Sequence, residues 1–238
     1  MRFEWPAPCP LVPPIVALSM AKPEDVPLER VVRALEEDII FARILPRERL
    51  VEDALMARFG AKRHVVRQAL TELERMGIVR RIPNKGAVVR DFSIDEVEQI
   101  YEMRSVLHER AARRMPLPGG AELVAALSTL HARHVEAARA GQLRSVYHLN
   151  NAFHDTLFGA CGNPYLAETI SHFAWLAHAI RSYRMADPEL LTLAQAEHAA
   201  MIEALRTGDR EGLVRLCVAH IEPAKATYLA TARTPAAV

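Results

Sequence analysis

The sequence of 238 residues predicts a mainly α-helical protein, in which an N-terminal winged helix-turn-helix with a β-hairpin wing precedes an all-α antiparallel six-helix bundle. Apolar residues recur at three- and four-residue spacing over most of the chain, which indicates amphipathic helices. A single pair of short apolar runs, around a Pro-Asn-Lys-Gly turn, indicates a hairpin. We expect a disordered tail over residues 1–24, the winged domain over 25–92 and the helical domain over 93–232.

The winged domain is predicted from three helical segments and the hairpin. The first helix runs from Leu28 to near Ala42, and the segment ILPRERL after it reads as a turn. Gly60 ends the second helix, because glycine tolerates the left-handed conformation of a helix C-terminus. The third helix covers about residues 62–76, and its inward positions are Val66, Ala69, Leu70 and Leu73. Two strands joined by residues 83–86 complete the domain.

Charge is unevenly distributed although the whole chain carries a net charge of only +1. Residues 28–90 hold 14 basic against 9 acidic side chains, and residues 58–90 hold 9 against 2. A basic third helix and hairpin tip suit a duplex, because the helix can enter the major groove and the tip can reach a phosphate. The predicted DNA contacts are Lys62, Arg63, His64, Arg67, Lys85 and Gly86. A solvated basic face on a protein-interaction module is the alternative.

The helical domain is predicted from the segments that follow Ser93. Ser93 with Glu96 has the spacing of a capping box, which opens a helix that runs to about Met115. Five further helical stretches are expected over about 121–139, 143–161, 164–184, 188–206 and 209–231. Pro223 should kink the last of these or begin a new helix.

Composition indicates the cellular compartment of the protein. The three cysteines have no CxxC spacing, which favours buried thiols in a reducing cytoplasm over a disulfide framework. No apolar run reaches the roughly 18–20 residues that a membrane helix needs. We therefore expect a cytoplasmic protein with no membrane partner.

The run LVEDALMARFGAKRHVVRQALTELERMGIVRRIPNKGAVV resembles the winged-helix domain of GntR-family bacterial transcription regulators. The segments YEMRSVLHERAA, NNAFHDTLFGACGNPYL and EHAAMIEALRTGD resemble the all-helical FCD ligand-binding domain of the FadR-like subfamily. The expected six helices suggest its shorter, VanR-like form. The resemblance implies a homodimer on a palindromic operator, most often acting as a repressor.

Three positions of the winged domain depart from the pattern of that family, and in the helical domain Asn150 stands where many members have Asp. Pro46-Arg47 stands where Pro-Gly is usual, and Lys62 stands where the recognition helix usually begins with Ser or Thr. Lys62 thereby forfeits a helix cap worth about 1 kcal/mol but adds a possible phosphate contact. Asp53 follows Glu52 where an arginine is frequent, so that one DNA contact is predicted to be missing.

A candidate metal site consists of Asn150, His154, His198 and His220. Asn150 and His154 are four residues apart on one helix face, and the other two histidines lie on later helices. Three imidazoles with one oxygen ligand suit a divalent ion such as zinc, nickel, cobalt or manganese. The resemblance strengthens this set, although a histidine on an apolar face can also be an ordinary core residue.

The resemblance also implies a small carboxylate effector beside the metal. Arg104 matches an arginine of the family's first C-terminal helix and could pair with a carboxylate, as could Arg181, and Tyr147 could line the pocket. The predicted function is a metabolite-responsive regulator and not an enzyme. A metal-dependent hydrolase fused to a winged helix is the alternative, but Glu197 and Asp155 adjoin the ligand histidines and point about 100° away from them.

Overall fold

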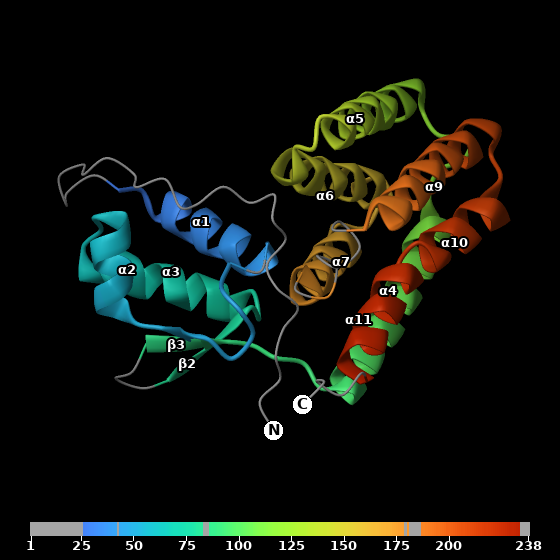
Figure 1. Cartoon of the computed structure of the whole chain (residues 1–238). Coiled ribbons are helices and arrows are strands. Elements are labelled where there is room, and N and C mark those ends of the chain that lie inside the picture. The colour runs from blue at the N-terminus through green and yellow to red at the C-terminus, as the bar shows by residue number, and fades with distance from the viewer. Residues whose placement is uncertain (1–25, 42, 83–85, 179, 181–186, 234–238) are drawn as a thin grey trace. The chain divides into compact units, whose positions relative to one another are not determined.

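The computed structural model describes residues 26–41, 43–82, 86–178, 180 and 187–233. The chain forms two compact units, which join in sequence between Phe92 and Ser93 (Figure 1). The predicted fold class is confirmed: a small three-stranded sheet accompanies the helices of the first unit, and the described part of the second unit is helical. The segment expected to be a disordered tail, residues 1–24, lies outside the described residues.

The first unit contains α1 (Leu28–Ile40), α2 (Glu52–Phe59) and α3 (Arg63–Arg75). Helix α3 packs against both of the others, and its four predicted inward residues are fully buried. Gly60 caps α2 in the left-handed conformation with φ 62°, as expected. Lys62 precedes α3 and its side chain makes no cap hydrogen bond, so that this helix does begin without the usual Ser or Thr cap.

The wing has one strand more than the sequence predicted. Strands β2 (Val79–Ile82) and β3 (Gly86–Val89) form the expected hairpin, and β1 (Arg49–Leu50) pairs with the other edge of β3. The sheet order is therefore β1-β3-β2, antiparallel throughout. The prediction of a plain turn before α2 was wrong because a two-residue strand has no periodicity of its own and exists through its partner.

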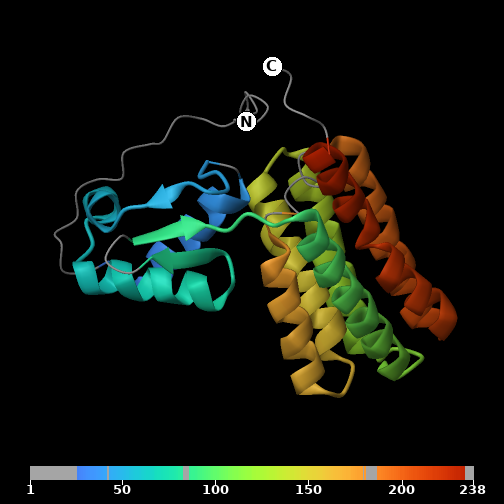
Figure 2. The same ribbon diagram turned by 90° about the horizontal axis from the view of Figure 1, so that it is seen from below.

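The second unit is a helical bundle. Its described helices are α4 (Ile94–Arg114), α5 (Ala121–Arg139), α6 (Leu143–Gly159), α7 (Pro164–Leu176), α9 (Pro188–Thr207), α10 (Arg210–Ala219) and α11 (Glu222–Arg233). Helix α4 packs against α7, α10 and α11, while α5 packs against α6 and α9. Figure 2 shows the helical unit from a second direction. The predicted capping box opens α4, with Ser93 Oγ accepting from the Glu96 amide at 3.2 Å.

The last predicted helix is two helices in the structure. Helix α10 ends at Ala219, and α11 begins at Glu222 with Pro223 in its first turn, so Pro223 starts a new helix instead of kinking one. The described residues after Phe92 therefore contain seven helices instead of six, and the helix count gives no support to the shorter form of the family. The break leaves His220 at a helix junction, where it can turn toward α6 and α9.

The core of this unit adjoins the predicted metal site, where the ring of Phe153 stacks on that of His198. Phe153, Leu157, Met201, Leu205 and Leu213 are almost completely buried between α6, α9 and α10. Close-packed side chains of this kind hold neighbouring groups in fixed rotamers. The imidazoles on the same helices therefore have a rigid support.

None of the helices among the described residues is both long and apolar enough to cross a lipid bilayer.

Candidate functional site

The N-terminal part of α3 presents the predicted basic side chains to solvent. Lys62, Arg63, His64 and Arg67 are all exposed, and Arg63 and Arg67 lie one turn apart on the same face. Lys85, the other predicted cation, lies outside the described residues. The described part of this face fits a recognition helix whose N-terminal residues contact a duplex.

Gly86 has a structural role that the sequence did not reveal. It is buried at the start of β3 with φ +85°, and an added Cβ would overlap the carbonyl oxygen of Leu50 on β1. Its burial does not suit the direct DNA contact that we predicted. Instead, Gly86 allows β1 to approach β3 closely, which completes the sheet of the wing.

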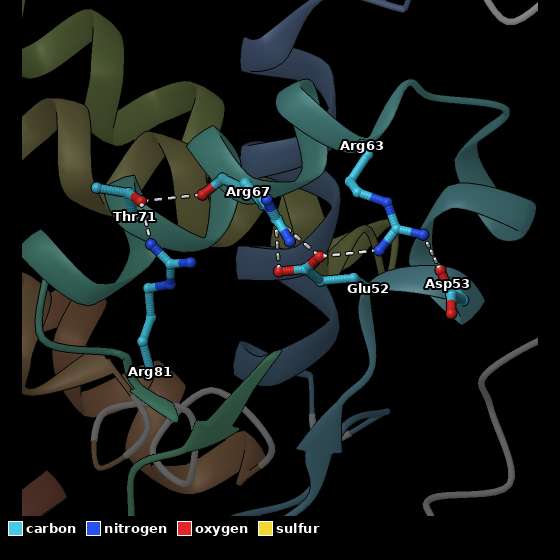
Figure 3. Close-up of polar contacts among 6 residues, drawn as sticks. All are labelled: Glu52, Asp53, Arg63, Arg67, Thr71 and Arg81. Atoms are coloured by element: carbon cyan, nitrogen blue, oxygen red, sulfur yellow. Dashed lines mark hydrogen bonds and ion pairs between the residues drawn. The ribbon is translucent and has the colours of Figure 1, made fainter. Parts of the chain in front are cut away.

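Two carboxylates of α2 contact the arginines of α3 (Figure 3). Arg67 Nε donates to both oxygens of Glu52, at 2.9 and 3.1 Å. Arg63 donates through Nη1 to Glu52 at 3.3 Å and through Nη2 to Asp53 at 2.6 Å. Glu52 and Asp53 were absent from the predicted site, although an acidic pair at the start of α2, ten or more residues before two arginines, was visible in the sequence.

The wing contacts the other end of the same helix face. Arg81 of β2 donates to Thr71 Oγ1 at 3.0 Å, and Thr71 in turn donates to the backbone oxygen of Arg67 at 2.9 Å (Figure 3). The Arg81 amide also donates to Glu74 at 2.9 Å. Polar contacts from α2 and from β2 thus hold α3 in place within the first unit.

Three histidines of the second unit converge on one point. The Nε2 atom of His154 on α6 lies 3.1 Å from that of His220 and 3.3 Å from that of His198 on α9. The ligand atoms that this trio offers all lie within 4.8 Å of one another. His198 is completely buried, and His220 is nearly so. The structure thus brings together the three histidines that the sequence predicted.

Glu197 supports this cluster from outside. Its Oε2 lies 2.6 Å from Nδ1 of His220, and the carboxylate is largely shielded from solvent. A histidine that donates Nδ1–H to a carboxylate presents Nε2 as a lone-pair donor, which is the usual arrangement around a bound metal ion. The sequence predicted that Glu197 lies off the ligand face of α9. It gave no indication that the Glu197 carboxylate would reach the imidazole of His220, at the junction of α10 and α11.

A cavity of about 70 Å³ adjoins the histidines. Its lining includes five predicted site residues: Asn150, His154 and His220 of the metal set, and Arg104 and Tyr147 of the effector set. Arg104 is 5% exposed, and its guanidinium carbon lies 4.7 Å from the centre of the Tyr101 ring. Arg181, the remaining predicted effector contact, lies outside the described residues. A buried cation beside converging imidazoles makes this cavity suitable for an anion.

Tyr147 is oriented by a partner that the sequence did not suggest. Its hydroxyl lies 2.5 Å from Nδ1 of His178, and both side chains are buried. The hydroxyl can therefore be held in one direction relative to the cavity that the ring lines.

Two further histidines line the cavity and were predicted to be ordinary residues. The Nδ1 atom of His108 lies 3.1 Å from the backbone oxygen of Cys217, and the ring packs 4.5 Å from that of Phe158. His134 on α5 is buried, and its ring lies 5.4 Å from that of His198. Burial, with a smaller contribution from His131, lowers the pKa of His134 to about 4. His134 is therefore a neutral imidazole at physiological pH.

The acidic groups nearest the cluster do not suit a hydrolase. Glu197 is engaged by His220, and Asp155 is exposed at the cavity and accepts from Ser171 at 3.3 Å. A metal-dependent hydrolase needs a general base that faces the reacting water. The described carboxylates therefore favour a binding site over a catalytic one.

A winged helix-turn-helix with an arginine-bearing recognition helix, followed by a helical domain with a histidine-lined cavity, is the architecture of a DNA-binding regulator. The chain belongs to the GntR family of such regulators: residues 27–89 match the bacterial regulatory proteins of the gntR family, and residues 99–223 match the FCD domain. The family resemblance read from the sequence is confirmed. Since members of the family are transcription regulators, the chain is a regulator and not an enzyme.

Individual relatives match most of the chain. The HTH-type transcriptional repressor RspR of Escherichia coli K12 is 24% identical over 197 residues, which cover 82% of this chain and 85% of the repressor. The structure of E. coli McbR/YncC superposes with a TM-score of 0.75 at 19% identity, covering 88% of this chain and all of that one. A GntR-family regulator from Rhodococcus sp. RHA1 gives a TM-score of 0.70 at 20% identity, covering 85% of this chain and 97% of that one. At these identities the solved structures support the fold alone.

Proposed function

We propose that this DNA-binding regulator is a cytoplasmic homodimer that responds to a small organic acid, which binds beside a divalent metal ion in the helical domain. The observation that carries the proposal is the convergence of three Nε2 atoms next to a cavity that contains a buried arginine. The residues assigned to the metal are His154, His198, His220 and Asn150. Zinc, nickel and manganese are the candidate ions.

The described residues fit a metal ion. A tetrahedral ion with metal–nitrogen bonds of about 2.0–2.1 Å separates its ligand atoms by roughly 3.3 Å. The two Nε2 separations of 3.1 and 3.3 Å are close to that value. The Glu197 contact to His220 Nδ1 adds the carboxylate that commonly orients a ligand histidine.

The cavity supports a small anionic effector. A volume of about 70 Å³ corresponds to roughly five water-sized sites, which suits an acid of few heavy atoms. Bound there, the ion would supply a Lewis-acidic position for one carboxylate oxygen. Arg104 would pair with the same carboxylate, and Tyr147, held by His178, would offer a directed hydroxyl. The ligand set Asn150 and three histidines is uncharged, which leaves the positive charge of the ion available to the effector.

The response to the effector would pass through helix positions. The cavity is lined by residues from α4, α5, α6, α7, α9, α11 and the junction between α10 and α11, so that an occupant contacts most of the bundle. An effector that binds one arrangement of these helices more tightly shifts the population toward it. In a homodimer on a palindromic operator, such a shift changes the spacing of the two recognition helices. A repressor that is released by its effector is the simplest form, and RspR, a relative of similar length, is a repressor.

Metal binding can be tested on purified protein by measuring metal content and zinc affinity. We expect His198→Ala to lose the ion, while His172→Ala, which alters an exposed histidine outside the cavity, retains it. Equal zinc affinity of the wild type and His198→Ala would overturn the metal assignment.

The effector can be tested by a gel shift with a duplex selected from a random library by the wild-type protein. A panel of mono- and dicarboxylates is added with and without a chelator. We expect at least one acid to release the duplex, and we expect Arg104→Gln and the chelator each to abolish this response while basal DNA binding remains. A response that is undiminished in the chelated protein would overturn the joint role of the ion and the acid.

A further inference from the structure

The start of α2 places two carboxylates against the recognition helix. Glu52 and Asp53 occupy the first turn of α2, and both accept hydrogen bonds from arginines of α3 (Figure 3). The Glu52 side chain is 13% exposed, whereas that of Asp53 is 75% exposed. One carboxylate therefore lies between the helices, and the other lies at the surface that α3 presents.

The two arginines use different edges of their guanidinium groups. Arg67 is held through Nε alone, so that its Nη1–Nη2 edge is not the one that Glu52 occupies. Arg63 is held through Nη1 by Glu52 and through Nη2 by Asp53, so that its Nη1–Nη2 edge faces carboxylates. Bidentate recognition of guanine O6 and N7 requires two N–H donors on one edge. The geometry thus makes the two arginines unequal.

We propose that Asp53 is a specificity-determining residue: it holds the Arg63 guanidinium against α2, so that Arg67 is the arginine that reads a base. The inference depends on the assignment of α3 as the recognition helix. It also extends the sequence-based expectation for Asp53, which was only that one DNA contact is missing there. Asp53 restrains a neighbouring arginine that a regulator of this class would otherwise use.

Electrostatics explains why this restraint persists on DNA. If Arg63 turned toward a phosphate, the Asp53 carboxylate would be left without its cation at a surface that faces the polyanion. The same carboxylate repels phosphates in any register, so it disfavours non-specific binding, which depends almost entirely on phosphate contacts. Arg67 escapes this penalty, because Glu52 lies between the helices and keeps its contact to Nε while the outer edge meets the base.

A double-mutant cycle between Asp53 and Arg63 tests the proposal. The affinity of the full chain for a duplex selected from a random library, and for a scrambled duplex, is measured by fluorescence anisotropy across a salt series. In the wild type we expect Arg67→Ala to weaken specific binding by about 5- to 150-fold. We expect Arg63→Ala to weaken it less than about threefold.

In the Asp53→Asn background, by contrast, Arg63→Ala should weaken binding by about tenfold or more, because the guanidinium has been released. Asp53→Asn alone should tighten binding to the scrambled duplex and steepen the salt dependence by about one phosphate contact, a slope change of roughly 0.9. Glu72→Gln is the matched control: it removes an acidic group that pairs with Arg75 on α3, away from the acidic pair of α2. Thermal melting confirms that each variant is folded.

An equal effect of Arg63→Ala in both backgrounds would overturn the proposal, as would an effect in the wild type as large as that of Arg67→Ala. A change caused equally by Glu72→Gln would also overturn it, since net charge alone would then suffice. These outcomes differ from a failure of DNA binding itself, in which the wild type selects no duplex from the library. That result would overturn both the assignment of α3 as a recognition helix and the role of Asp53.

Discussion

Replacement of Glu197 by glutamine changes one atom in contact with the histidine cluster and leaves the proposed ligands in place. The carboxylate lies 2.6 Å from Nδ1 of His220 and is mostly shielded from solvent. A charged acceptor at this position strengthens the imidazole as a ligand and fixes which nitrogen bears the proton. The amide of glutamine can accept the same hydrogen bond but carries no charge, so the lone pair on Nε2 becomes a weaker donor.

The magnitude follows from the usual contribution of such outer carboxylates. Their loss reduces metal affinity by about 10- to 100-fold, which corresponds to roughly 1.4–2.7 kcal/mol. Glu197→Gln should fall at the lower end because its oxygen still accepts from Nδ1, and Glu197→Ala should reach the upper end.

The assay is a competition titration of the purified protein with a chromophoric zinc chelator at fixed pH and salt. Glu203→Gln is the control, because Glu203 lies on the same helix but is exposed and pairs with Arg206. Zinc affinity of Glu197→Gln within twofold of the wild type would refute the reasoning. An equal loss in Glu203→Gln would also do so, because the effect would then be one of net charge.

Gly86→Ala should destabilise the winged unit by about 2 kcal/mol or more, because the new Cβ meets the Leu50 carbonyl at positive φ. Gly120→Ala should cost at most about 1 kcal/mol, because the space there is open and only the N-cap preference for glycine over alanine is lost. Urea unfolding measures both changes. Burial raises the pKa of Cys217 to about 12. Iodoacetamide should therefore leave this thiol unlabelled in the native protein up to pH 9 and label it in urea, which peptide mass spectrometry can check. Rapid labelling of the native protein would contradict the burial of this thiol. Because the pKa of His134 is about 4 in the folded chain and near 6.5 in the unfolded one, the unfolded state binds the extra proton between these values. The free energy of unfolding, measured with a chelator present so that no metal is bound, should therefore fall as the pH drops from 6.5 to 4. The fall should be larger in the wild type than in His134→Gln by on the order of 2–3 kcal/mol. Parallel pH profiles of the two proteins would contradict the lowered pKa of His134.

Local signals in the sequence predicted most of the secondary structure. The capping box at Ser93, the left-handed end of α2 at Gly60 and the inward face of α3 all depend on residues within one or two turns of each other. Each was predicted correctly because such interactions are the same in any tertiary context. Strand β1 was missed, because a strand of two residues depends on what packs against it. The sequence left open whether Pro223 would kink the last helix or begin a new one, and the structure has a new helix there.

Some functional residues could likewise be predicted from local sequence, whereas others were found only in the structure. The spacing of Asn150 and His154 and the basic N-terminus of α3 could be read from the chain. The Glu197 contact to His220 joins residues 23 positions apart, and no periodicity links them. His134 likewise reaches the cavity from a helix that the sequence gave no reason to connect with the site.

By itself, the sequence determined the two-domain order, the helices and the family, because these follow from hydrophobic periodicity, helix caps and motifs that are contiguous in the chain. The tertiary structure alone decided which charged groups meet. It directed Asp53 toward Arg63, Glu197 toward His220, and three imidazoles from separate elements toward one point. The physical reason is that a side-chain contact between two elements depends on how both are rotated and packed, and this is settled only when the whole core forms.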